Sequence, residues 1–133
     1  MDLEDEVELI LQSLIKEKSE YNYKRNVKIR GASGHSWEAD FVLYKEGKID
    51  AIIECKDISS KNIQTFDTQM CRAYTRLNDL RLKYPQARYY VIVRELPRDT
   101  ILEKWGDIFR QVSIELLSLE MLKELPFEDT LLT

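Results

Sequence analysis

Two short runs of hydrophobic residues, separated by a polar turn, dominate the first half of the chain. Residues 37–44 (WEADFVLY) predict one strand, and residues 49–56 (IDAIIECK), rich in β-branched and apolar side chains, predict a second. The segment between them, residues 45–48, contains Gly47, which can take the positive φ that a tight hairpin turn requires. The pattern therefore predicts a β-hairpin.

The second strand of this hairpin ends with charged residues although its centre is apolar. Because side chains alternate across a strand, Glu54 and Lys56 share one face, while Ile53 and Cys55 share the other. A glutamate and a lysine at the end of such a strand are costly to bury without partners. We therefore expect them to meet Asp40 of the neighbouring strand, a water and a metal ion. Two carboxylates on adjacent strands form a hard oxygen site that suits Mg²⁺ or Mn²⁺.

Hydrophobic periodicity predicts helices and further strands on both sides of the hairpin. The long central helix shows it most clearly, because its apolar residues follow the three- and four-residue spacing of one helix face. The predicted helices cover residues 2–18, residues 62–84, a segment capped by Thr100, and residues 119–125; the further strands cover residues 21–30, 87–93 and 113–117. The order α, β, β, β, α, β, α, β, α predicts an α/β fold with a mixed central sheet flanked by helices.

Proline, serine and glycine mark the limits of several of these elements. Pro85 is expected to end the long helix and Pro126 the last one, because proline cannot continue a helix. Ser118 is expected to cap the last helix. Residues 30–36, which include two glycines, predict a flexible turn into the hairpin.

The composition is that of one globular domain spanning residues 1–133. Apolar residues make up 44% and charged residues 33%, which is an ordinary balance for a single core. Cys55 and Cys71 form no CxxC motif, which argues against a zinc site or a disulfide framework. No apolar run is long enough to span a membrane, and the acidic N-terminus does not resemble a signal peptide. We therefore expect no membrane partner and a cytoplasmic location.

Charge is distributed unevenly along the chain. The net charge is −4, which argues against a simple DNA-binding protein. Residues 1–20 hold seven acids and two bases, whereas residues 21–35 hold four bases and no acid. Residues 58–94 hold seven bases and two acids, and residues 95–133 are acidic again. Since local potential decides phosphate binding, an acidic protein can still present a basic cleft.

Two groups of polar side chains are candidates for nucleic-acid contacts. Gln69, Arg72 and Arg76 lie beside the apolar stripe of the long helix, where they can face phosphates across a cleft. Lys28 and Arg30 lie on the polar side of the first predicted strand and can follow a DNA backbone. The alternative for Arg76 is a solvated basic helix face. The alternative for the strand is an edge guarded by basic residues.

The hairpin and its charged residues resemble a known family. An acidic residue, a hairpin and then Glu-x-Lys at the end of an apolar strand are similar to the PD-(D/E)XK nuclease superfamily. Here the motif stands as Asp40 followed by Glu54-Cys55-Lys56. Ala39 replaces the proline after which the family is named. The resemblance continues on both sides of the motif and covers most of the chain.

The resemblance implies a restriction-endonuclease-like αβββαβ core and a metal-dependent DNA endonuclease. Asp40 and Glu54 would then hold one or two Mg²⁺ ions, with the main-chain carbonyl of Cys55 as a further ligand. The metal would lower the pKa of a bound water, and Lys56 would position or deprotonate that water. The resemblance is to Mrr-like restriction enzymes and to archaeal Holliday-junction resolvases, between which the sequence does not choose.

The first predicted helix contributes one more candidate, Glu4. Nucleases of this superfamily often use a glutamate from the first helix, and the segment that begins Leu3-Glu4 looks like the corresponding segment of Mrr-like enzymes. Acidic residues are also favoured at a helix N-terminus by the helix dipole, so a solvated helix end is the alternative. Glu4 and Glu6 flank the apolar stripe on opposite sides, and the helical wheel does not decide between them.

Three readings of the whole chain are therefore open. The first is a metal-dependent DNA endonuclease, acting as a homodimer or recruited by a partner subunit, since cutting both strands of a duplex needs two sites. The second is a catalytically silent nuclease-fold module that binds nucleic acid or protein. The third is an α/β domain in which Glu54 and Lys56 form a structural ion pair.

Overall fold

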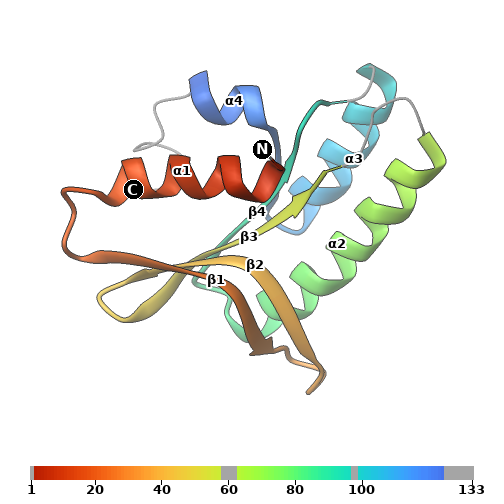
Figure 1. Ribbon diagram of the computed structural model, residues 1–133. Coiled ribbons are helices and arrows are strands. Elements are labelled where there is room, and N and C mark those ends of the chain that lie inside the picture. Colours follow the sequence, from red (N-terminus) through yellow and green to blue (C-terminus); the bar gives the residue numbers. More distant parts are fainter. Residues whose placement is uncertain (1, 58–62, 97–98, 125–133) are drawn as a thin grey trace.

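Five strands form one mixed β-sheet with helices on both of its faces (Figure 1). This computed structural model describes residues 2–57, 63–96 and 99–124. Within these ranges the predicted order of elements is confirmed. The elements are α1 (Leu3–Ile15), β1 (Tyr21–Arg30), β2 (Ser36–Lys45), β3 (Lys48–Lys56), α2 (Ile63–Lys83), β4 (Arg88–Val93), α3 (Asp99–Gln111), β5 (Ile114–Ser118) and α4 (Leu119–Glu124).

The strands lie in the order in which they occur in the chain. β1, β2 and β3 are antiparallel neighbours, whereas β3, β4 and β5 run parallel to one another. Parallel neighbours need crossover helices, and the right-handed rule places α2 and α3, which cross in the same direction, on the same face. α1 and α4 cover the opposite face (Figure 1). None of the helices in the described ranges combines the length and apolarity needed to cross a membrane.

β3 is the central strand, and its two faces separate two hydrophobic clusters. Ile53 and Cys55 pack in the cluster that contains the buried residues of α1. Ile52 packs in the cluster that contains the buried residues of α2 and α3. The predicted apolar stripe of α2 is confirmed, since Phe66, Met70, Ala73, Leu77 and Leu80 are fully buried. Glu54 and Lys56 therefore leave β3 on the side of α2, as the alternation predicts.

The hairpin between β2 and β3 closes with a two-residue turn. Lys45 is paired with Lys48, and the two residues between them have positive φ, 52° at Glu46 and 79° at Gly47. Positive φ at both central positions is typical of the turn type whose twist matches that of antiparallel strands. The turn predicted at Gly47 is thus confirmed.

Some element ends differ from those predicted. α1 ends at Ile15 instead of residue 18, because Lys18 N–H donates to the Ile15 carbonyl and closes a turn there. α3 begins at Asp99, so Thr100 lies inside its first turn and not at the cap position. Ser118 Oγ does accept from Met121 N–H at 3.0 Å, as predicted for a cap. The start predicted at residue 62 and the stop at Pro126 lie outside the described residues.

The turn between β1 and β2, predicted to be flexible, is tethered to α2 by Asp79. Asp79 Oδ1 accepts from Ser33 N–H at 2.8 Å, and Asp79 Oδ2 accepts from Ser33 O–H at 2.7 Å and from Trp37 Nε1–H at 2.7 Å. The Asp79 main-chain carbonyl accepts from Ala32 N–H at 3.1 Å. The glycine-rich pattern of the turn does not reveal a partner 46 residues away in the chain.

We predict that Gly31→Ala destabilises the protein by about 1–3 kcal/mol. A Cβ at this position would lie 2.1 Å from Asp79 Oδ2, and moving that carboxylate breaks the tether. Gly106→Ala on α3 is the matched control, since its Cβ meets nothing closer than 3.7 Å and alanine favours a helix by about 0.5–1 kcal/mol. Urea unfolding measures both, and a Gly31→Ala variant as stable as Gly106→Ala would contradict the tether.

Candidate functional site

Asp40 lies where β2 and β3 separate. Pairing between these strands ends at Phe41 and Ile53. One residue further, Asp40 Oδ2 accepts a 2.7 Å hydrogen bond from Cys55 N–H, so a side-chain carboxylate continues the ladder in place of a main-chain carbonyl. This bond holds Asp40 at the carboxyl end of β3.

Glu54 presents a buried carboxylate with incomplete hydrogen bonding. Its side chain is 2% exposed, and Oε2 has no hydrogen-bond partner. Two cations approach Oε2 without reaching hydrogen-bond distance: Arg76 Nη1 at 3.7 Å and Lys56 Nζ at 4.0 Å. Lys56 is itself mostly buried, with 12% of its side chain exposed. A buried oxygen left in this way is costly unless another group binds it.

Burial and a neighbouring negative charge raise the pKa of both carboxyl groups. Burial, together with the charge of Asp40, raises the pKa of Glu54 to about 8, and Lys56 and Arg76 offset this only in part. Burial, together with the charge of Glu4, also raises the pKa of Asp40, against the opposing effect of the Cys55 N–H bond. Both carboxyl groups therefore favour a neighbour that brings positive charge.

Cys55 contributes its main chain to this site and not its thiol. The thiol lies on the α1 side of the sheet, and burial raises its pKa. The N–H and C=O groups of one strand residue point to the same side, so the Cys55 carbonyl is directed toward the edge where Asp40 lies. This placement is compatible with the carbonyl as a metal ligand.

Of the acidic residues in α1, Glu4 lies on the side of Asp40. Its charge raises the pKa of Asp40, and its Oε2 accepts from Arg25 Nη2 at 3.1 Å. Glu6 lies on the other flank of α1, where Arg94 Nη1 is 2.6 Å from its Oε2. The sequence left open which of the two glutamates approaches the site, and the structure favours Glu4.

Arg25 is a residue that the sequence pattern did not single out. It extends from β1 toward α1 and pairs with Glu4, with Asp5 at 2.8 Å and with Glu8 at 3.0 Å. One guanidinium group thus collects three acids of α1 and sets where Glu4 lies. Alternation alone placed Arg25 on a strand face but gave no sign of its partners.

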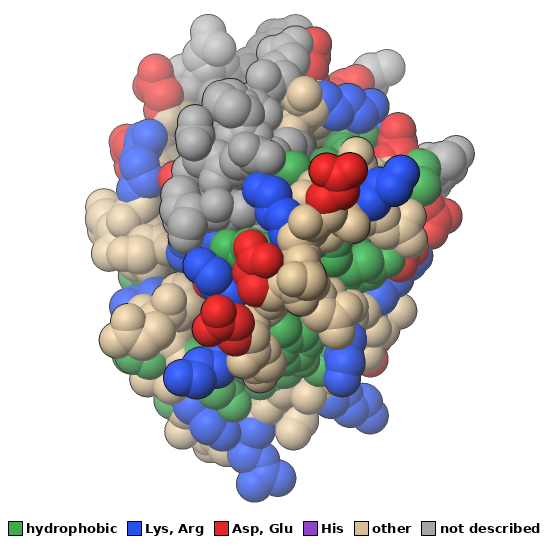
Figure 2. All heavy atoms as spheres, turned by 90° about the vertical axis from the view of Figure 1, so that its left-hand side faces the viewer, with side chains coloured by type: hydrophobic (Ala, Val, Ile, Leu, Met, Phe, Trp, Pro, Cys, Tyr) green, Lys and Arg blue, Asp and Glu red, His purple; other side chains and the backbone are tan. Residues whose placement is uncertain are grey.

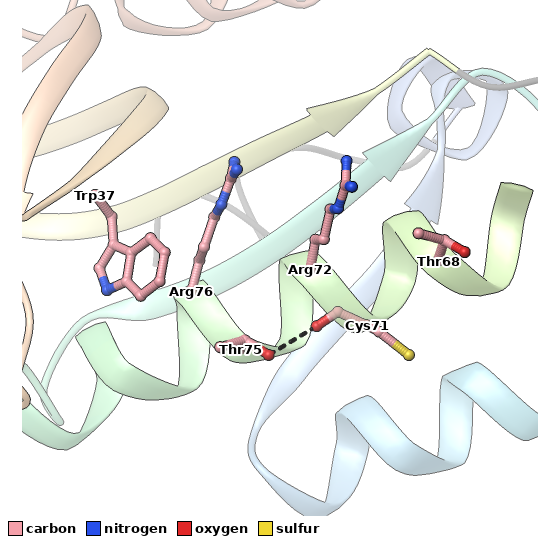
Figure 3. Close-up of a pocket in the computed structure, with 6 residues that line it drawn as sticks. All are labelled: Trp37, Thr68, Cys71, Arg72, Thr75 and Arg76. Atoms are coloured by element: carbon pink, nitrogen blue, oxygen red, sulfur yellow. Dashed lines mark hydrogen bonds between the residues drawn. The ribbon is translucent and has the colours of Figure 1, made fainter. Parts of the chain in front are cut away.

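A hollow of about 470 Å³ lies on α2 (Figure 3), and one of its lining residues, Arg76, comes within 3.7 Å of Glu54 Oε2. Arg72 and Arg76 line it and project to the same side of the helix, with Trp37 of β2 beside Arg76. The Arg76 guanidinium lies 5.9 Å from the Trp37 ring centroid, a cation–π distance. Gln69, half-buried, precedes Arg72 and Arg76 on the same helix face by helical spacing. Trp37 is the second residue that the sequence pattern did not single out.

Lys28 and Arg30 are not brought into the cluster around Glu54. Val27 and Ile29 pack with the α2 cluster, so the two exposed basic residues project from the opposite face of β1. Figure 2, which shows the side that lies to the left in Figure 1, has acidic and basic side chains interspersed and a mainly basic lower margin. The contacts predicted for Lys28 and Arg30 stay a prediction.

The donors around Glu54 are few. Among the described residues, no three His, Cys, Asp or Glu side chains form a group that could hold a metal ion. The site contains two carboxylates, those of Asp40 and Glu54, and the main-chain carbonyl of Cys55. Mg²⁺ commonly takes one or two carboxylates and completes its shell with water and substrate phosphate.

Comparisons with known proteins bear on the fold alone. No protein-family model matches the chain, and no curated protein matches its sequence. Among solved structures, the chain is similar to the crystal structure of the protein of unknown function AF1548. The TM-score is 0.55 at 18% sequence identity, over 90% of this chain. The chain spans only 64% of the length of AF1548, and an identity this low shows a shared fold and nothing further.

We predict that replacing Glu54 by glutamine changes how stability depends on pH. In the unfolded chain Glu54 loses its proton near 4.5, whereas in the folded protein it keeps the proton up to about 8. The unfolded state therefore binds fewer protons in this window, and the wild type loses stability, on the order of a few kcal/mol, as pH rises through it. Glu54→Gln removes this loss.

Urea unfolding of both proteins from about pH 5 to about pH 8.5 measures the effect. The matched control is Glu115→Gln, since Glu115 is exposed on β5 and its replacement should leave the pH dependence unchanged. Equal pH dependence in the wild type and in Glu54→Gln would contradict a shifted Glu54.

Proposed function

We propose that this protein is a metal-dependent DNA endonuclease of the PD-(D/E)XK superfamily. The observation that carries the proposal is the buried Glu54 carboxylate, whose Oε2 has no hydrogen-bond partner and which lies beside Asp40 and Lys56 on one hairpin. The order of α1 to β4 is compatible with the αβββαβ core of that superfamily. The likeness to AF1548 adds nothing on activity.

The residues present fit a divalent metal ion. Glu54 offers an unsatisfied buried oxygen, and Asp40 and the Cys55 carbonyl supply further hard oxygen donors. Asp40 and Glu54, with this carbonyl, would hold Mg²⁺ or Mn²⁺. When bound, the ion would supply an acidified water and neutralise charge on the phosphate oxygens.

The chain's own groups account for the rest of the proposed hydrolysis. Lys56 ends β3 with its ammonium group 4.0 Å from Glu54 Oε2 and largely shielded from solvent. A cation in this position orients the attacking water and stabilises the negative charge that develops on the phosphate. Glu4, fixed by Arg25, adds negative charge next to Asp40 and strengthens the attraction of the site for a cation.

A second candidate function is a catalytically silent nuclease-fold module. Two observations favour it: Glu4 is already paired with Arg25, and Lys56 and Arg76 already offset part of the Glu54 charge. Such a module would bind nucleic acid or protein without cutting. For either function the net charge of −4 favours weak binding to DNA by one chain, so we include in the proposal a homodimer or a recruiting partner subunit.

We predict that Asp40→Ala and Glu54→Ala each lower metal-dependent DNA cleavage by at least about a hundredfold, because each removes a ligand of the activating ion. The assay uses plasmid, linear, single-stranded and four-way-junction DNA with Mg²⁺ or Mn²⁺. Glu115→Ala, which removes an exposed acid from β5, should retain activity. Undiminished cutting by Glu54→Ala would contradict the proposed endonuclease site. No cutting by the wild type on any substrate would favour the silent module.

We also predict that Mg²⁺ or Mn²⁺ raises the thermal unfolding temperature of the wild type. A ligand that binds only the folded state at a hundred times its Kd stabilises it by about 2.7 kcal/mol. The rise should shrink sharply in Asp40→Asn and in Glu54→Gln, which keep the shape of each side chain and remove its charge. Equal rises in all three proteins would place the ion elsewhere.

A further inference from the structure

The hollow on α2 combines positive charge with an aromatic wall. Its lining residues are Trp37, Thr68, Cys71, Arg72, Thr75 and Arg76, and its volume of about 470 Å³ is in the range of small-ligand sites. Arg72 and Arg76 are one helical turn apart and extend to the same side (Figure 3). Guanidinium groups match phosphate oxygens with paired N–H donors, so the hollow has the chemistry of a phosphate site.

Arg76 is held loosely by Glu54 and has donors to spare. The 3.7 Å separation from Glu54 Oε2 exceeds hydrogen-bond length, so this ion pair does not use up the five N–H donors of the guanidinium group. Arg72 is exposed, and no ion pair links it to another described residue. An anion in the hollow can therefore bind both arginines, and no hydrogen bond between Arg76 and Glu54 has to break.

Trp37 fixes where Arg76 lies. The Arg76 guanidinium lies over the Trp37 ring, and the indole N–H donates to Asp79 Oδ2. Asp79 is in turn bonded to the β1–β2 turn through Ser33. The ring is thus anchored at its far edge, on α2 itself, one turn beyond Arg76. Asp79 therefore holds the Trp37 ring in place, and the ring in turn holds the Arg76 guanidinium group beside Glu54.

We propose that the hollow is a phosphate subsite in which Arg72 and Arg76 bind a backbone phosphate of the DNA strand, and in which Trp37, held by Asp79, is a positioning residue for Arg76. Arg76 belongs both to the hollow and to the surroundings of Glu54, so the bound phosphate is a neighbour of the one that is cut. This inference rests on the proposed endonuclease function for the identity of the ligand. The inference adds to the proposed function that the DNA strand is held from the α2 side of the site.

Binding without metal tests the subsite separately from cleavage. The probe is a short fluorescent single-stranded oligonucleotide in the presence of a chelator, followed by anisotropy at several salt concentrations. Arg72→Ala and Arg76→Ala should each weaken binding about five- to tenfold and reduce the slope of log K against log salt by about 0.7 per lost contact. Arg110→Ala, an exposed arginine on α3, is the control and should change neither. Unchanged binding in Arg76→Ala overturns the subsite.

A double-mutant cycle tests the positioning role. Trp37→Ala should weaken binding about as much as Arg76→Ala, and the double variant should be no weaker than Arg76→Ala alone, because Trp37 acts through Arg76. Trp37→Ala combined with Arg72→Ala should be weaker than either single variant. Additive losses in Trp37→Ala/Arg76→Ala would reduce Trp37 to a structural residue and overturn its assignment.

Two conservative variants decide the matter even if Trp37→Ala does not fold. Trp37→Phe keeps a ring for Arg76 but removes the indole N–H, and Asp79→Asn weakens the acceptor of that N–H. Each variant should lower the affinity, by less than Trp37→Ala. Circular dichroism and thermal unfolding confirm that each variant is folded. Affinity in Asp79→Asn equal to that of the wild type would contradict the anchored ring.

Competition separates a backbone phosphate from a free anion. Inorganic phosphate and a nucleoside monophosphate should displace the oligonucleotide only at concentrations far above its Kd. Displacement by inorganic phosphate at a similar concentration would make the hollow a free-anion site and overturn the backbone assignment. If the cycle behaves as expected but no DNA is cut, the subsite stands and the endonuclease fails; DNA cut with no effect of Arg76→Ala on binding gives the opposite result.

Discussion

The hydrogen bond from Cys55 N–H to Asp40 Oδ2 is the interaction on which the site depends. It forms where β2 and β3 stop pairing, so the strands are free to separate while the carboxylate still closes the gap between them. Without it, Asp40 would not be held next to Glu54, and its charge would no longer add to burial in raising the pKa of Glu54. The proposed site therefore depends on one substitution in the ladder: the acceptor of the Cys55 N–H is the Asp40 carboxylate and not a main-chain carbonyl of β2.

The hairpin is also the part of the structure that the sequence predicts best. Alternation and a positive-φ glycine are local properties, so they place Glu54 and Lys56 on one face and close the turn at Gly47. The long apolar stripe of α2 and the order of the elements are read in the same way. All of these features are set by residues close together in the chain, which is why the sequence alone predicts them.

The surroundings of the hairpin depend on contacts between distant parts of the chain. Trp37 and Asp79 are 42 residues apart, and Arg25 meets Glu4 across 21 residues. Each contact is set by how α1 and α2 pack on the sheet, which no local pattern encodes. The β1–β2 turn was predicted to be flexible for the same reason, because its anchor lies on α2. The exact ends of α1 and α3 were also not predicted, since neighbouring residues compete closely for the cap position.

α1 is fastened to the sheet in two physically different ways. Leu3, Val7 and Leu11 are buried beneath it, whereas its flanks are held by charge, with Arg25 on one side and Arg94 on the other. Added electrolyte screens the charges on the partly exposed flanks but does not weaken the packing of the buried underside. We therefore expect the local opening of α1, which presents Glu4 to Asp40, to respond to ionic strength more than that of β3 and β4, whose core residues are fully buried.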